Sequence, residues 1–241
     1  MDDAPAFTPS PRSQVRRRPQ RAAYDEAAVF EILDAGLMAH VGYVIDGQPY
    51  VTPTAYWREG RTLYWHGAAA SRMLGTVGRG VPVCVTVSFL DGLIVGRSGI
   101  MHSLNYRSVM AFGRARAVAD PAAKRAAMDA FIDRLYAGRP LKLRPTTDAE
   151  LARIALVEME IEEASAKVRS ADAAELEPEP GWAAWAGVFP IETRIGAPAP
   201  ARGEAAPHTP DLSPYAEGAR LDAALAAASR ASRSAGSGRS G

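Results

Sequence analysis

Two polar segments lie in a region rich in β-forming residues, and their side chains suit the binding of an anion. The first runs from Leu63 to Leu74 and reads LYWHGAAASRML. It predicts a strand that ends near His66 and Gly67, a stretch of small residues, and a helix that begins at Ser71 and Arg72. Amide groups at a helix start, with a hydroxyl and a guanidinium beside them, form a natural phosphate pocket. A surface turn with a solvated arginine is the alternative interpretation of this segment alone.

The second segment runs from His102 to Ala115 and reads HSLNYRSVMAFGRA. It places Arg107 and Ser108 at the start of a strand whose continuation is largely apolar. A guanidinium at the mouth of a barrel is well placed for a second contact to an anion. The alternative is an edge-strand arginine that pairs with a glutamate.

Other chemistry is not indicated by local motifs. The chain has no Walker-type phosphate loop, no dinucleotide glycine fingerprint, no His-Glu-x-x-His and no Gly-x-Ser-x-Gly elbow. Its histidines, His40, His66, His102 and His208, are too scattered for a local metal motif, so we expect no metal site. The single cysteine, Cys84, cannot form an internal disulfide.

The elements that must position these segments are mostly short strands. Asp46-Gly47, Glu59-Gly60 and Asp91-Gly92 are pairs typical of tight hairpins, which join antiparallel strands. We expect strands near 38–45, 49–57, 62–66, 81–90, 93–101, 105–118 and 155–162, and helices near 25–37, 71–79, 120–135 and 148–154. The pattern predicts a mainly β (α+β) fold: a small antiparallel barrel of six or seven strands with peripheral helices.

Length and composition indicate one folded domain with two tails. Of 241 residues, 47% are apolar and 23% charged, which is ordinary for a globular protein. We expect a disordered basic arm over 1–23, the domain over 24–196, and a disordered Ala/Pro/Gly/Ser-rich tail over 197–241, with a short helix near 221–228 as an option.

The charge distribution bears on partners and location. The net charge is +1, the arm carries +3 and the tail +1, so the domain carries +1 − 3 − 1 = −3. A mildly acidic domain argues against nucleic-acid binding. No apolar run is long enough to cross a bilayer, so we expect no membrane partner and a cytoplasmic location.

Several segments in order resemble the pyridoxamine 5′-phosphate oxidase-related, FMN-binding split-barrel family, most closely its nitroimidazole-reductase-like branch. They are Gln48 to Pro53, Tyr64 to Gly67 with Ser71-Arg72, and Asn105 to Val109 followed by Gly113 to Ala115. Ser165 to Arg169 and Trp185 to Pro190 resemble that branch's closing segments. The resemblance covers roughly residues 25–190. It implies a split β-barrel that forms a homodimer with FMN at the subunit interface.

The resemblance also implies which residues contact the flavin. Ser71 and Arg72 match the phosphate contacts, and His66 with Gly67 lies near the flavin. The strand along the isoalloxazine ring and the second strand that reaches the flavin supply the remaining predicted contacts: Val51, Thr52, Pro53 and Thr54, and Asn105, Tyr106, Arg107 and Ser108.

The implied function is an FMN-dependent oxidoreductase that reduces a small planar electrophile such as a nitroaromatic or a quinone. His66 is the predicted catalytic residue, as an orienting group or proton donor. The chain lacks the substrate-phosphate signature of a true pyridoxamine phosphate oxidase, so vitamin B6 synthesis is not expected. A flavin-binding protein without turnover, and a deazaflavin- or haem-binding split barrel, remain alternatives, because no substrate-specific side chain is evident.

Overall fold

The computed structural model describes residues 6–172, 181–205 and 209–237, with the side chains of 233–237 left out. Its strands are β1 (Ala22–Ala23), β2 (Met38–Ile45), β3 (Gln48–Glu59), β4 (Thr62–Ala68), β5 (Arg79–Val95), β6 (Ser103–Ala117), β7 (Ile154–Glu160), β8 (Glu163–Arg169) and β9 (Gly187–Pro190). The helices are α1 (Glu26–Asp34), α2 (Arg72–Val77), α3 (Pro121–Leu135), α4 (Asp148–Ala152) and α5 (Leu221–Ser237). Short 3-10 helices occur at Pro19–Arg21, Gly99–Met101, Arg139–Lys142 and Pro210–Tyr215.

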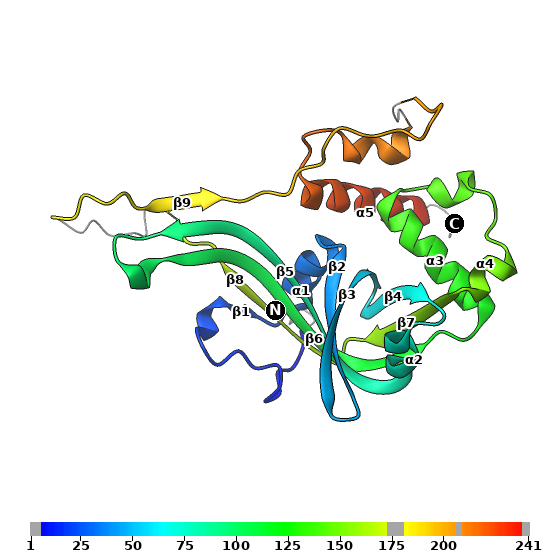
Figure 1. The fold of residues 1–241 in the computed structure, drawn as a ribbon, viewed down its shortest axis with the longest axis horizontal. Coiled ribbons are helices and arrows are strands. Elements are labelled where there is room, and N and C mark those ends of the chain that lie inside the picture. Colours follow the sequence, from blue (N-terminus) through cyan, green and yellow to red (C-terminus); the bar gives the residue numbers. More distant parts are fainter. Residues whose placement is uncertain (1–5, 173–180, 206–208, 238–241) are drawn as a thin grey trace.

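All strands form one antiparallel sheet that closes partly on itself, which confirms the predicted split-barrel class. Its order is β1-β8-β6-β7-β4-β3-β2-β5-β9, and a further pairing joins β5 to β6. The pairings therefore complete a ring through β2, β3, β4, β7, β6 and β5, while β8, β1 and β9 extend the sheet outside the ring. Figure 1 shows the long β5–β6 hairpin, with β9 alongside, projecting away from the body.

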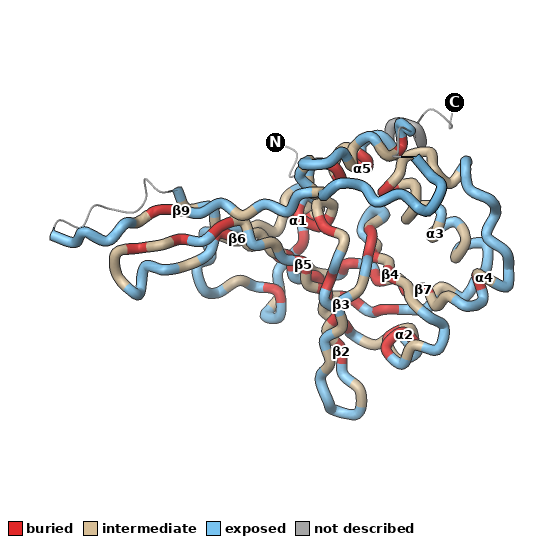
Figure 2. Tube along the Cα trace, turned by 45° about the horizontal axis from the view of Figure 1, so that its top comes forward, coloured by how far each residue is buried: buried red, intermediate tan, exposed pale blue. Residues whose placement is uncertain are grey.

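The core fills the ring and is closed by two helices. Buried side chains include Leu63, Trp65, Val41 and Val85 from the strands, and Figure 2 shows buried segments concentrated in the body. Val29 and Leu33 of α1 join this core, as do Met73, Leu74 and Val77 of α2. The Tyr56 hydroxyl donates to the Leu33 carbonyl, which ties the barrel wall to α1.

Side-chain caps begin the helices where the sequence predicts them. Asp25 accepts a hydrogen bond from Ala28 N at 2.8 Å, and Asp120 accepts one from Ala123 N at 2.7 Å ahead of Pro121. Thr147 and Glu150 form the predicted capping box of α4. These bonds satisfy amides that have no partner inside the helix.

One predicted hairpin is wrong. Asp46-Gly47 and Glu59-Gly60 do turn the chain, with φ of +81° at Gly47 and +57° at Gly60. Gly92, however, lies inside β5, and the chain reverses beyond Val95. A β-bulge between Leu90 and Gly92 takes the place of the turn, and a Cβ at Gly92 would meet the Phe189 carbonyl oxygen of β9 at 3.1 Å.

Described residues of both segments predicted to be tails contact the domain. In the arm, Phe7 is buried, Ser13 donates to Glu163 at 2.6 Å, and Ala22–Ala23 pair with β8. In the tail, α5 extends beyond the short helix considered and buries Leu225 beside α3. A few well-spaced apolar residues in each tail are enough to anchor it.

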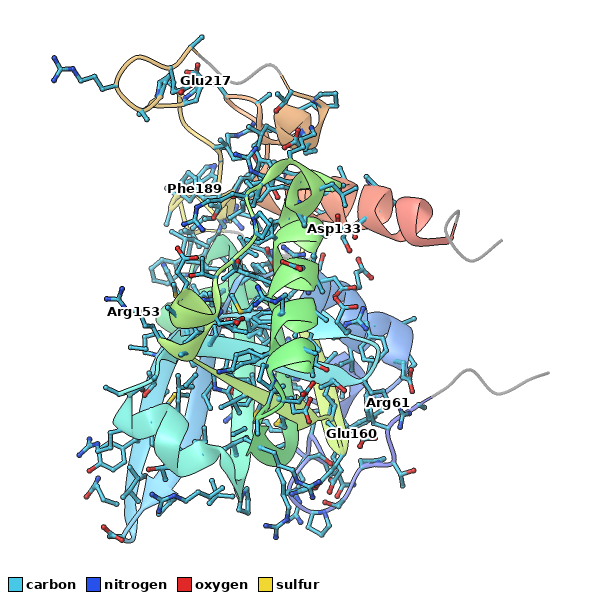
Figure 3. The ribbon with its side chains drawn as sticks, turned by 90° about the vertical axis from the view of Figure 1, so that its right-hand side faces the viewer. Arg61, Asp133, Arg153, Glu160, Phe189 and Glu217 are labelled. Atoms are coloured by element: carbon cyan, nitrogen blue, oxygen red, sulfur yellow. The ribbon has the colours of Figure 1, made fainter. Side chains whose placement is uncertain are left out.

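Helix α3 lies along the outside of the strands, and α5 crosses beside it (Figure 3). Ser232 of α5 donates to Asp133 of α3, and the Tyr215 hydroxyl donates to the Leu135 carbonyl at 2.6 Å. Among the described residues, no helix combines the length and apolar character needed to span a bilayer.

We predict that Gly113→Ala destabilises the fold by about 3 kcal/mol, because a Cβ there overlaps the Glu160 carbonyl oxygen and lies 2.8 Å from Met159 Cγ. Gly75→Ala is the matched control, since no atom of the described residues lies within 4 Å of a Cβ at that position, apart from its own helix backbone and chain neighbours. Urea unfolding of both variants measures the difference. Equal stability of the two variants would contradict the close packing at Gly113.

Candidate functional site

The first half of β3 has a free edge. β3 pairs with β2 from Gln48 to Ala55, but it pairs with β4 only from Tyr56 to Glu59. Beyond His66, β4 pairs with β7 alone. The predicted ring-contact residues Val51, Thr52, Pro53 and Thr54 therefore lie on a strand that has no partner on one side within the described chain. Backbone N–H and C=O groups along such an edge are open to a planar ligand.

The corner between β4 and α2 lies beside this edge. Ser71 caps α2, with its hydroxyl accepting from Leu74 N at 3.4 Å. The Arg72 guanidinium lies 5.0 Å from the ring centroid of Tyr50 on β3 and has no ion pair within the described chain. Its donors are therefore available, and Gly67 to Ala70 leave the adjacent backbone uncrowded. The structure thus brings the predicted phosphate residues next to the predicted ring strand.

His66 lies where β3 and β4 separate, under α3. Its ring centroid is 5.9 Å from that of Trp57 and 5.5 Å from that of Phe131. The Nδ1 atom is buried, and no described residue makes a hydrogen bond with it. Burial lowers the pKa of His66, because desolvation disfavours the charged ring. Desolvation thus favours the neutral form of this imidazole.

The second predicted segment divides between the two faces of the sheet. Asn105 is buried and bonds both backbone groups of Ala171, with Nδ2 to O and N to Oδ1 each 2.9 Å. Arg107 donates to Asp91 at 2.8 and 3.0 Å, and this pairing raises the pKa of Arg107. Tyr106 and Ser108 point to the opposite face, because neighbouring side chains alternate along a strand. In one protomer, Asn105 and Arg107 do not join the β3 edge.

The sheet face that carries Tyr106 and Ser108 is apolar and exposed. Register places one set of exposed side chains on it, from β3 across to β9: Met38, Val44, Val51, Leu90, Leu93, Leu104, Met110 and Phe189. Val51 is 67% exposed and Met38 61% exposed. His40 lies on the same face, opposite Pro53 and Thr86. Within the described residues nothing covers this surface.

Sequence reasoning missed the apolar face. It considered a glutamate as the partner of Arg107, whereas the structure pairs Arg107 with two aspartates, Asp91 and Asp222. Alternation in 38–44 and 104–112 signals a two-sided sheet, but it does not show which face stays uncovered. Asp222, 3.5 Å from Arg107, lies 115 positions later in the chain, so no local pattern could have revealed it. His102 lies in an exposed turn away from His66, and His208 is outside the described residues.

Comparisons with known proteins place this geometry in a family. The family model described as pyridoxamine 5′-phosphate oxidase matches residues 25–168. No curated protein matches the chain. Among solved structures, the flavocytochrome Anf3 from Azotobacter vinelandii is 37% identical, with a TM-score of 0.78 over 88% of this chain and 100% of that one.

Two further structures are similar. The FAD and haem binding protein from Mycobacterium smegmatis is 33% identical, with a TM-score of 0.74 over 83% of this chain and 98% of that one. A candidate 5-nitroimidazole antibiotic resistance protein from Bacteroides thetaiotaomicron is 24% identical, with a TM-score of 0.49 over 61% of this chain and 86% of that one. The chain belongs to the pyridoxamine 5′-phosphate oxidase-related family of flavin-binding split-barrel proteins.

Proposed function

We propose that this protein is a flavin-dependent redox protein that also binds haem. The observation that carries the proposal is the likeness to a flavocytochrome at 37% identity over that protein's whole length. This likeness covers 88% of the chain, so it extends well beyond the residues 25–168 that the family model matches. The similar protein from Mycobacterium smegmatis, which binds FAD and haem, supports the same pair of groups.

The β3 edge and the Arg72 corner fit a flavin. We propose that the backbone of Val51 to Thr54 lies along the ring, with Ser71 and Arg72 on the phosphate next to the ribityl chain. Both FMN and FAD carry that phosphate, so these contacts suit either one. A bound flavin supplies the electron transfer, while the protein supplies placement and shielding from water.

His66 fits a haem iron. We propose His66 as the haem ligand because its Nδ1 has no partner in the described part of the chain, its pKa is lowered by burial, and Trp57 and Phe131 make its surroundings apolar. Haem ligation is proposed beside the orienting or proton-donor role expected from the sequence, which stays a prediction. His40 is exposed on the sheet face and lacks such an enclosure.

A second copy of the chain fits the exposed apolar face. Large apolar side chains spread over several neighbouring strands make a contiguous surface of the kind that marks an interaction site. We propose that the homodimer forms on this face, which brings Tyr106 and Ser108 of each protomer into the interface.

The electron acceptor we propose is a small planar electrophile, a nitroaromatic or a quinone, which can reach a ring held at the β3 edge.

The absorption spectrum of the protein tests the function. We expect flavin bands and, after addition of haemin, a haem band with one equivalent bound. His66→Leu is expected to abolish the haem band and keep the flavin, whereas His40→Leu keeps both. Near-UV circular dichroism checks that each variant is folded. A spectrum without flavin, or with flavin but no haem uptake, contradicts the corresponding half of the proposal.

Removal of the Arg72 guanidinium tests the phosphate contact. We expect Arg72→Ala to weaken FMN and FAD binding about ten- to a hundredfold, the loss of one charge-assisted hydrogen bond. Riboflavin, which lacks the phosphate, should bind this variant as it binds the unmodified protein. Arg79→Ala is the matched control, an exposed arginine just beyond the other end of α2. Equal losses for FMN and riboflavin would argue against the contact.

Sedimentation velocity tests the dimer. We expect a particle of twice the 25.6 kDa chain mass at micromolar concentration. Met110→Asp should shift it to the monomer, because a carboxylate at the centre of the apolar face has no partner there. Leu141→Asp changes an exposed leucine away from that face and should leave the dimer intact. A monomeric unmodified protein rules the interface out.

A further inference from the structure

A cavity lies on the side of β6 opposite Ser108 and Met110. Its volume is about 550 Å³, and its walls come from α1, β6 and α5. A smaller cavity of about 230 Å³ adjoins it, and the two share Ala35, Arg107, Arg220 and Asp222. Volumes of this order accommodate small organic ligands. The α5 wall lies outside residues 25–168, so the C-terminal segment completes the cavity.

One wall of the cavity carries two arginines, Arg107 and Arg220, and both already pair with carboxylates. Arg107 uses Nε and Nη2 on Asp91, and its Nη2 lies 3.5 Å from Asp222. Among the described residues, its Nη1 has no acceptor. The guanidinium is fixed by Asp91 and by the Phe89 ring, whose centroid lies 4.7 Å away. A positioned guanidinium with free N–H groups is suited to a carboxylate or a phosphate.

The carboxylate of Asp222 occupies the space beside these arginines. Its oxygens accept from Arg220 at 2.8 and 3.1 Å and from Ala223 N at 2.8 Å, at the start of the 17-residue helix α5. The pKa of Asp222 is lowered, first by the bond from Arg220. The longer distance to Arg107 leaves that donor weakly used. Arg220 also donates from Nη1 to Glu192 at 3.0 Å. An incoming anion therefore competes with Asp222 for Arg107, and with both Asp222 and Glu192 for Arg220.

The α1 wall contributes the acidic side chains Glu31 and Asp34, and Arg230 of α5 also lines the cavity. Glu31 of α1 lines the cavity, and its carboxylate has no partner among the described residues. Between the two walls the lining is small and apolar, with Ala35, Ala223 and Ala226. This arrangement favours a ligand with an anionic group at one end, a flat or apolar middle, and a hydrogen-bond donor at the other end.

We propose that this cavity is a second ligand site, separate from the flavin site, for a mononucleotide-sized organic phosphate or carboxylate. Arg107 and Arg220 bind the anionic group in place of Asp222, and Glu31 accepts from the donor end. The site lies on the other side of the sheet from the exposed apolar face, so its occupant need not contact a flavin at the β3 edge. The proposal does not depend on the identity of the redox groups.

Calorimetric titration of the full chain with adenosine 5′-monophosphate tests the site. This probe carries a phosphate, a flat ring and an amino donor, and adenosine is the matched ligand without the anion. We expect the monophosphate to bind below about 1 mM and at least about tenfold more tightly than adenosine. Its binding should leave the flavin absorbance unchanged.

Three variants separate the proposed contacts from a general change in the fold. Arg107→Gln should weaken binding about tenfold or more, and Asp222→Asn should tighten it severalfold because the competing carboxylate is lost. Such a gain cannot come from misfolding. Arg202→Gln is the control, since Arg202 is an exposed arginine of the same C-terminal segment and lines neither cavity.

Three results would overturn the proposal. Equal affinity for adenosine and its monophosphate would contradict the proposed contact to the anion. Absence of binding up to about 10 mM would contradict the site itself. An unchanged or weakened affinity in Asp222→Asn contradicts the competition. Release of the flavin by the monophosphate assigns the cavity to the cofactor instead. If Arg72→Ala loses flavin binding but still binds the monophosphate, the second ligand site is unaffected. The proposal of the flavin site and the proposal of the second site can therefore be contradicted independently.

Discussion

The change of partner along β6 is the constraint on which the rest of the structure depends. From Tyr106 to Phe112, β6 pairs with β8, and from Ala115 to Ala117 it pairs with β7. Gly113 lies at the change, where the Glu160 carbonyl leaves no space for a Cβ. Because β7 then pairs with β4, the ring closes on one side of Gly113, while β8 keeps the sheet open on the other. The open part is what exposes the apolar face and supports α1.

Local sequence patterns predict where most of the strands lie along the chain, but they do not predict how the strands pair in the sheet. Positive φ at Gly47 and Gly60 is a local property of an acid–glycine turn, and the alternation in 81–89 identifies a half-buried strand. Asp91-Gly92 has the same composition and does something else, because its conformation depends on Asn105 and on β9, which pair with Gly92. The conformation at Asp91-Gly92 is therefore determined by strand pairing with distant segments and not by the local turn preference.

The candidate site was predictable in part for the same reason. Ser71 and Arg72 follow a strand directly, so their place beside the β3 edge follows from neighbouring elements. The role of His66 was harder to infer, because its pKa and its orphan nitrogen depend on α3, which folds over it from more than 50 residues later. The pairing of Arg107 was the hardest to predict, because its guanidinium forms ion pairs with Asp91 across the hairpin and with Asp222 in the C-terminal segment.

Alternation along β6 links the two faces of the open sheet through one backbone. Arg107 and Asp91 are held together beside the bulge at Leu90 and Gly92. Leu90 pairs with Tyr106, whose side chain points to the apolar face. The ion pair therefore fixes the register at which Tyr106 and Ser108 meet whatever covers that face. A partly shielded ion pair contributes modest stability by itself, so its larger consequence here is positional: the charge contacts on one face set the geometry of the other.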